Sequence, residues 1–209
     1  MSARFFARHA ATPSQLGVAP AGTWQVGRLV SGAPRIDADI NAEAGTVVAH
    51  EQHVLTDGRW LAAHSGALEV FDRLEPTLWA ETLPRLREQR ATESEGELIF
   101  LWVLSRLEDE DLARPGQASI GPLIDSVRDA VASVTGWASE AGAVSPSLSL
   151  VLSDGSRLLA VRRGVPLYWL EQSSPVPAVL VASEPLTEES WHRALDGMVL
   201  AAGPDGLLV

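Results

Sequence analysis

The chain has 209 residues, of which 46% are apolar and 21% charged, and a formal net charge of −11. This composition is typical of a globular domain with one large core, and the negative charge argues against nucleic-acid binding, which needs clustered cations. Because the chain contains no cysteine and no lysine, thiolate catalysis, thiolate zinc sites, disulfides and lysine-based cofactor chemistry are excluded.

The first quarter of the chain predicts short strands and loops. Phe5–Ala7 is apolar and predicts a first strand, whereas Thr12–Gly22 is rich in Pro, Gly and small residues and predicts a loop. Trp24–Val30 and Thr46–Ala49 are short apolar runs, typical of buried strands. Asp57-Gly58 is a hairpin-turn signal that joins two further apolar pairs.

The middle of the chain predicts helices. Leucines recur at helical spacing over 68–86, where two prolines start or interrupt segments. Glu95–Leu107 carries a continuous apolar face, and Thr92 or Ser94 fits the N-cap position. Ile120–Ala141 repeats the helical pattern.

After residue 146 the apolar pattern changes to a period of two, which indicates strands. Leu148–Leu152 and Arg157–Arg163 predict a β-hairpin around a Ser-Asp-Gly-Ser turn. Leu167–Trp169 and Ala178–Ala182 predict two more strands, and Trp191–Ala202 begins the closing segment. Strands, then helices, then strands favour sheets with helices packed outside them.

We expect one domain and a cytoplasmic location. No internal repeat or linker divides the chain, so residues 1–209 are predicted to form a single domain. No run of 18 or more apolar residues predicts a membrane span. The first nine residues lack the apolar core of a secretory signal.

Several segments, in order along the chain, resemble one known family. They are Ala3–Ala7, Gly22–Gly27, Thr56–Gly66 (TDGRWLAAHSG), Ala91–Glu95, Leu150–Trp169 and Val181–Leu186 followed by Trp191. Together they resemble the class II glutamine amidotransferases, in particular the small γ-glutamyl amidohydrolases of ergothioneine biosynthesis. This resemblance implies an α+β fold, the αββα sandwich of the N-terminal nucleophile hydrolases, in which two antiparallel sheets lie between helical layers.

The nucleophile of that family has no counterpart in this chain. In the family, an N-terminal cysteine attacks a glutamine or γ-glutamyl amide, and its own α-amine serves as the base. The best register places Ala3 at that position. A shift of one residue places Ser2 there instead, as a candidate serine nucleophile, but such a shift turns each strand side chain to the opposite face.

Three further functional positions of the family are altered. The Asn-Gly pair of the oxyanion hole corresponds to Ser65-Gly66, and losing one such donor costs about 100- to 1,000-fold in rate. The arginine that holds the substrate carboxylate should follow Val47–Ala49, where the chain has His50-Glu51-Gln52-His53. Glu93 keeps the charge of the ammonium-binding aspartate. His50, Gln52, His64 and Glu93 are therefore the candidate ligand-binding residues.

Other polar residues have simpler interpretations. His50 and His53 would point to opposite faces of a strand, so no metal site is expected there. No cofactor is expected either. His64 follows apolar residues and fits a hydrogen-bonded structural role as well as ligand binding. The acidic run Glu108–Asp111 predicts a solvated loop at the end of a helix.

Three hypotheses of function remain open. In the first, the chain has lost glutaminase chemistry and acts as a binding or assembly subunit, in a homo-oligomer or with an active homologue or biosynthetic enzyme. In the second, it is an active amidohydrolase with Ser2 as the nucleophile. In the third, the pocket has been adapted to another small molecule or another reaction.

Overall fold

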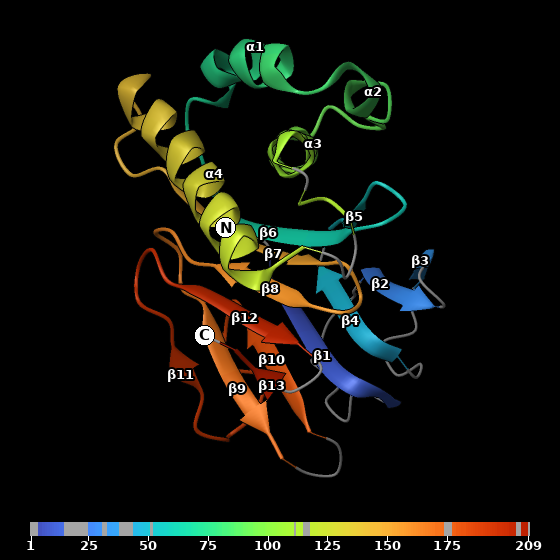
Figure 1. Ribbon diagram of the computed structural model, residues 1–209. Helices are drawn as coiled ribbons and strands as arrows, with labels where there is room; N and C mark the ends of the chain where they lie inside the picture. The colour runs from blue at the N-terminus through green and yellow to red at the C-terminus, as the bar shows by residue number, and fades with distance from the viewer. Residues whose placement is uncertain are drawn as a thin grey trace.

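The computed structural model describes residues 4–14, 25–30, 33–37, 44–50, 52–110, 112–114, 118–173, 177–203 and 206–208. Its strands form two sheets in which every described pair is antiparallel (Figure 1). The first sheet contains, in spatial order, β11 (His192–Arg193), β9 (Tyr168–Gln172), β10 (Ala178–Ala182), β1 (Phe5–Ser14), β4 (Ala44–His50), β2 (Gln25–Val30) and β3 (Ala33–Asp37). The second contains β13 (Gly206–Leu207), β12 (Val199–Gly203), β8 (Leu158–Val161), β7 (Ser147–Ser153), β6 (Leu61–Ala67) and β5 (Leu55–Thr56).

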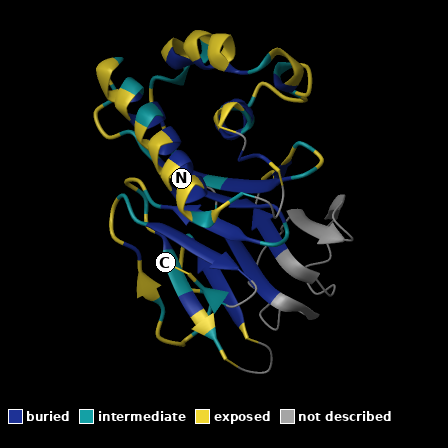
Figure 2. Ribbon diagram, viewed as in Figure 1, coloured by how far each residue is buried: buried dark blue, intermediate teal, exposed yellow. Residues whose placement is uncertain are grey.

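The described helices lie together on one side of the sandwich, over the six-stranded sheet (Figure 1). They are α1 (Phe71–Glu81), α2 (Pro84–Arg87), α3 (Glu95–Asp109) and α4 (Ile120–Glu140). Every residue of α3 from Leu98 to Ser105 is buried, because α1, α2, α4 and the sheet surround it (Figure 2). A helix that is apolar on all sides is stable only in such an enclosed position.

The space between the sheets is filled by small and medium apolar side chains. Phe5 and Ala7 of β1 belong to the same core cluster as Leu61, Val151 and Leu200 of the six-stranded sheet. The alternation of the strand places Phe6 on the outer face of the first sheet, where it packs with Trp191. In the described part of the chain this outer face carries no helix (Figure 1).

The fold confirms the predicted α+β class with two antiparallel sheets, and the predicted strands and helices lie where the sequence pattern placed them. Three local expectations were wrong. Strand β1 continues to Ser14 because β4 pairs with it there, so residues 12–14 are not loop. Strand β3 was not predicted. Glu108 lies within α3, and its side chain is only 9% exposed because Arg59 and Arg85 bind it, so it is not part of a solvated loop.

Candidate functional site

The candidate site lies where β1 begins and β4 ends. Phe5, at the start of β1, pairs with His50, the last residue of β4. The backbone N–H of Phe5 donates to the hydroxyl of Ser183 (3.1 Å), and Arg4 forms an ion pair with Glu184 (2.8 Å). These contacts attach the start of β1 to the Ser-Glu-Pro segment that follows β10.

The ring of His50 is buried, and backbone groups bind both of its nitrogens. Its Nδ1 accepts the N–H groups of Gln52 and His53, each at 3.0 Å. A nitrogen that accepts two N–H groups carries no hydrogen, so Nε2 is the protonated atom, and it donates to the carbonyl oxygen of His64 at 2.9 Å. Both ring nitrogens are therefore occupied, and the imidazole is fixed as one neutral tautomer.

His64 lies on β6 beside this ring. The two imidazoles stack with centroids 5.9 Å apart and an angle of 24° between their planes. The residue as a whole is partly exposed, but its Nδ1 is buried and has no partner among the described residues. Burial, with a smaller electrostatic contribution from the neighbouring His50, lowers the pKa of His64 to about 4, so the ring is neutral near pH 7.

The ring of His64 also fills the space between β6 and the first turn of α3. A Cβ atom at Gly96 would lie 1.8 Å from Nε2 of His64, so only glycine fits beneath the ring. Ser94 caps this helix by accepting the N–H of Glu97 at 3.2 Å, as the sequence predicted. Burial raises the pKa of the neighbouring Glu95 carboxyl.

Ser65 and Gly66 follow His64 on β6. The period of the strand directs Ser65, which is buried, toward the seven-stranded sheet, on the same side as Ala63. Gly66 has a φ of +131°, and a Cβ there would lie 2.2 Å from the carbonyl oxygen of Ser147. This close approach of two backbones requires glycine.

The remaining predicted residues are not gathered around the two histidines. Gln52 is exposed, and only its backbone contacts His50. Glu93 is also exposed and lines a hollow of about 410 Å³ with Trp79, Arg87 and Arg90. Ser2 lies outside the described residues.

Two features of the structure could not be found by motif. The contact of Gly96 with His64 joins residues on different elements, and neither residue signals it in sequence. The hollow among Arg59, Arg85 and Arg114 likewise draws on three separate segments.

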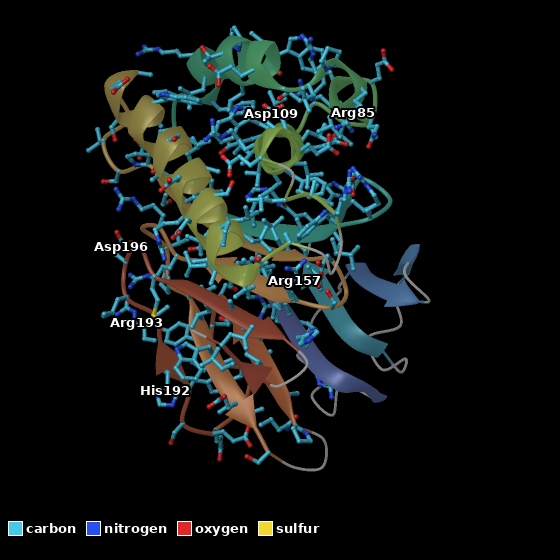
Figure 3. All side chains as sticks on the ribbon, in the orientation of Figure 1. Arg85, Asp109, Arg157, His192, Arg193 and Asp196 are labelled. Atoms are coloured by element: carbon cyan, nitrogen blue, oxygen red, sulfur yellow. The ribbon has the colours of Figure 1, made fainter. Side chains whose placement is uncertain are left out.

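Other groups of chemistry-bearing residues do not extend the site. His192 stacks on Trp169 at the β11 edge of the first sheet, with ring centroids 4.4 Å apart (Figure 3). Among the described residues, no three His, Asp or Glu side chains converge on a point that could hold a metal ion. In the same part of the chain, no helix is both long and apolar enough to cross a membrane.

Comparison with known proteins gives matches of structure alone. No protein-family model matches the chain, and no curated protein sequence matches it significantly. A glutamine aminotransferase class-II domain protein from Silicibacter pomeroyi is similar over 98% of this chain and 97% of its own, with a TM-score of 0.77 and 22% identity. A predicted glutamine amidotransferase from Pseudomonas aeruginosa gives a TM-score of 0.69 over 99% of both chains, at 16% identity.

The chain has the class II glutamine amidotransferase fold. The glutamine phosphoribosylpyrophosphate amidotransferase of B. subtilis shares it at a TM-score of 0.63 and 10% identity, over 98% of this chain and 48% of that enzyme. Identities this low establish the fold and leave function open. Within the amidotransferase fold, the roles that the resemblance implies for Ser2, Ser65, Gly66 and Glu93 stay predictions.

Proposed function

We propose that this chain is a catalytically degenerate protein of the class II glutamine amidotransferase fold, and that it acts as a binding or assembly subunit. The observation that carries the proposal is the state of His50. It follows Val47–Ala49, where the resemblance implies a carboxylate-binding arginine, yet both of its ring nitrogens are bound to the backbone. The ring of His50 therefore has no free donor for a substrate carboxylate.

Other residues support the same proposal. The chain has no cysteine to serve as the family's nucleophile. Ser65 replaces the oxyanion-hole amide with a shorter hydroxyl side chain. The ring of His64 fills the space above Gly96, next to the start of α3. In the B. subtilis amidotransferase the matching domain is about half of a longer chain, which supports a role beside another protein.

Detection of a stable complex would test the assembly role directly. Native mass spectrometry of the purified chain, alone and with co-expressed candidate biosynthetic enzymes, should give a stable species of defined stoichiometry. A clean monomer that associates with none of them counts against a subunit role.

One observation favours an active hydrolase as the second candidate. Gly66 adopts the backbone conformation that only glycine tolerates, at the position where the resemblance implies an oxyanion donor. Hydrolysis of glutamine and γ-glutamyl amides, followed by ammonia release, separates the two candidates. We expect no turnover above that of heat-denatured protein. Turnover that Ser2→Ala abolishes would establish the serine hydrolase instead.

The hollow beside Glu93 supports the third candidate, a pocket adapted to another small molecule. Trp79 is 38% exposed there, and the guanidinium groups of Arg87 and Arg90 lie 5.7 and 5.5 Å from its ring centroid. An aromatic face with charges of both signs suits a small zwitterion. Thermal-shift screening with amino acids tests it, and the absence of any shift counts against this candidate.

A further inference from the structure

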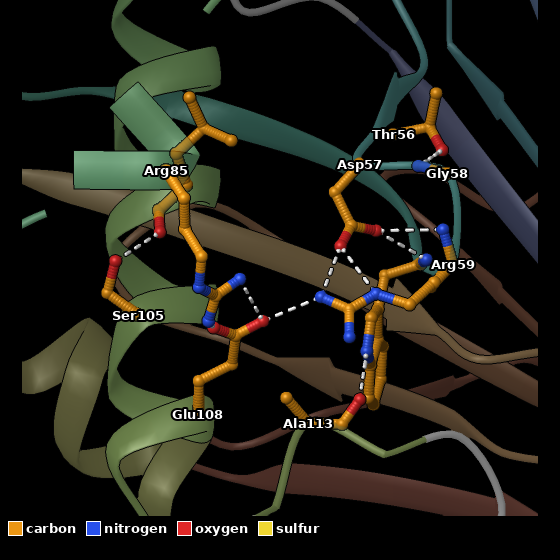
Figure 4. Close-up of polar contacts among 10 residues, drawn as sticks. Thr56, Asp57, Gly58, Arg59, Arg85, Ser105, Glu108 and Ala113 are labelled. Atoms are coloured by element: carbon orange, nitrogen blue, oxygen red, sulfur yellow. Dashed lines mark hydrogen bonds and ion pairs between the residues drawn. The ribbon is translucent and has the colours of Figure 1, made fainter. Parts of the chain in front are cut away.

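Three arginines from separate elements line a hollow of about 240 Å³. Figure 4 shows two of them, Arg59 and Arg85, directed toward Glu108. Arg59 comes from the turn between β5 and β6, Arg85 from α2, and Arg114 from the segment after α3. Glu108 of α3 and Ala113 complete the lining. None of these residues belongs to the histidine site.

The guanidinium of Arg59 is held in place by the turn that carries it. Asp57, whose side chain is fully buried, accepts Nε and Nη2 of Arg59 at 3.2 and 3.0 Å. The other carboxylate oxygen of Asp57 accepts the backbone N–H groups of Arg59 and Trp60 at 2.9 and 2.8 Å. Nη1 of Arg59 has no partner in the described part of the chain and remains able to donate to a ligand.

Glu108, the one carboxylate that lines the hollow, is already neutralised. Its Oε1 accepts from Arg59 at 2.6 Å and from Arg85 at 2.9 Å, and its Oε2 forms an ion pair with Arg85. Arg114 is exposed and has no hydrogen bond or ion pair within the described residues. Among the described residues, the carboxylates of Asp57 and Glu108 balance two of the three guanidinium charges, and the remaining positive charge lies on Arg114.

The floor of the hollow is fixed by a buried tryptophan. The indole Nε1 of Trp60, a fully buried residue, donates to the carbonyl oxygen of Ala113 at 3.0 Å. This bond holds the backbone next to Arg114. Arg59, whose guanidinium Asp57 and Glu108 hold, also needs little rearrangement to meet a ligand, which lowers the entropic cost of binding.

We propose that this hollow binds a small anion through a carboxylate or phosphate group, held by Arg114 and by the exposed edges of Arg59 and Arg85. Planar guanidinium groups donate pairs of N–H bonds that match both kinds of oxyanion. The net charge of −11 repels large polyanions such as nucleic acids, whereas a small anion is attracted by the uncompensated positive charge of Arg114. The site is independent of the histidine site and of the function proposed above.

The test is a nuclear magnetic resonance titration of the full chain with inorganic phosphate and, separately, with malonate, at constant ionic strength set by chloride. The indole N–H resonance of Trp60 reports on the hollow because that group supports its floor. We expect saturable shifts of this resonance. Arg114→Gln should weaken binding about tenfold or more, since it removes charge-assisted hydrogen bonds.

Arg128→Gln is the matched control, because Arg128 is an exposed arginine of α4 that pairs only with Asp125 in the described structure. It should bind as the unmodified chain does. Tighter binding of phosphate than of malonate, or the reverse, assigns the ligand's head group. The absence of a saturable shift with both anions, or equal weakening in the two variants, overturns the proposal. Arg114 has no described partner, so its replacement should leave the unfolding temperature unchanged.

Discussion

At the scale of single residues, Gly66 combines a positive φ with a backbone that leaves no room for a Cβ atom. With a φ of +131° and the carbonyl oxygen of Ser147 2.2 Å from an added Cβ, Gly66→Ala imposes both backbone strain and a clash. We expect it to lower the free energy of unfolding by at least about 2 kcal/mol, measured by urea denaturation. Gly136→Ala is the control. It lies in α4 with open space around it and should raise stability by about 0.5–1 kcal/mol. Similar effects of the two changes would contradict the assigned strain.

The titration of His64 gives a prediction for pH. Its pKa is lowered from 6.5 to about 4 in the folded chain. Between these two pH values the unfolded chain binds a proton here and the folded chain does not, so the free energy of unfolding falls as the pH falls. This loss amounts to about 3 kcal/mol. Urea unfolding at a series of pH values between 4 and 7 measures it.

The control variant is His64→Gln, which cannot titrate. His9, whose pKa is also lowered by burial, acts in the same direction, whereas Glu95, whose pKa is raised, acts in the opposite one. Subtracting the variant's pH profile of unfolding free energy from that of the unmodified chain removes the contributions of His9 and Glu95. A flat difference between pH 4 and 6.5 would show that His64 titrates normally.

The sequence identified these residues but not their environments. Ser65-Gly66 and His64 were selected because they lie within a family-like motif. The strain at Gly66 depends on Ser147 of β7, and the lowered pKa of His64 depends on burial and, to a smaller extent, on His50. Such effects arise from residues far apart in the chain, so they cannot be inferred from a short sequence motif.

At the scale of elements, a second turn repeats the hydrogen bonding of the turn that carries Arg59. In the β7–β8 turn, the hydroxyl of Ser153 accepts the N–H of Gly155 at 3.0 Å. Oδ1 of Asp154 accepts the backbone N–H groups of Ser156 and Arg157, and Oδ2 accepts Nε and Nη2 of Arg157. Arg157, labelled in Figure 3, also donates to the carbonyl oxygen of Ala118, just before α4. The turn therefore anchors the start of that helix.

The two turns differ in exposure, and that difference predicts different costs of mutation. The side chain of Arg157 is 9% exposed, against 42% for Arg59, which also keeps its pair with Glu108. Asp154→Asn leaves a buried guanidinium without its countercharge and should cost about 3–5 kcal/mol. Asp57→Asn should cost about 1 kcal/mol. Urea denaturation of both variants measures this contrast, and equal losses would contradict it.

Elements with a clear period were predictable from sequence. The period of 3.6 over Ile120–Ala141 predicted α4 because its apolar stripe faces the core. Apolar residues at helical spacing over Glu95–Leu107 predicted α3, although the structure buries this helix on all sides from Leu98 to Ser105. Strand β3 (Ala33–Asp37) was missed, since it contains Pro34, Arg35 and Asp37 and has no apolar alternation. It lies at the edge of its sheet and pairs only with β2 among the described strands, so its pairing and not its side chains defines it.

At the scale of the whole molecule, the order of family-like segments predicted the fold although each segment is a weak signal. Their order constrains the topology, and structures that share 22% and 16% of residues confirm the fold over almost the whole chain. The hollow among Arg59, Arg85 and Arg114 was not predictable. Its residues acquire a common role only when the β5–β6 turn, α2 and the segment after α3 meet in three dimensions.

The loss of function proposed for the whole molecule involves more than its nucleophile, and restoring that nucleophile tests this. A chain in which Ser2 is deleted and Ala3 is changed to Cys begins with a cysteine once Met1 is removed. Ammonia release from glutamine and γ-glutamyl amides should stay at the level of the unmodified chain, because His50 offers no free donor for a substrate carboxylate. Thiol titration shows that the new cysteine is accessible. Turnover above that level would mean that the cysteine alone was lost and that Ser65 suffices beside Gly66.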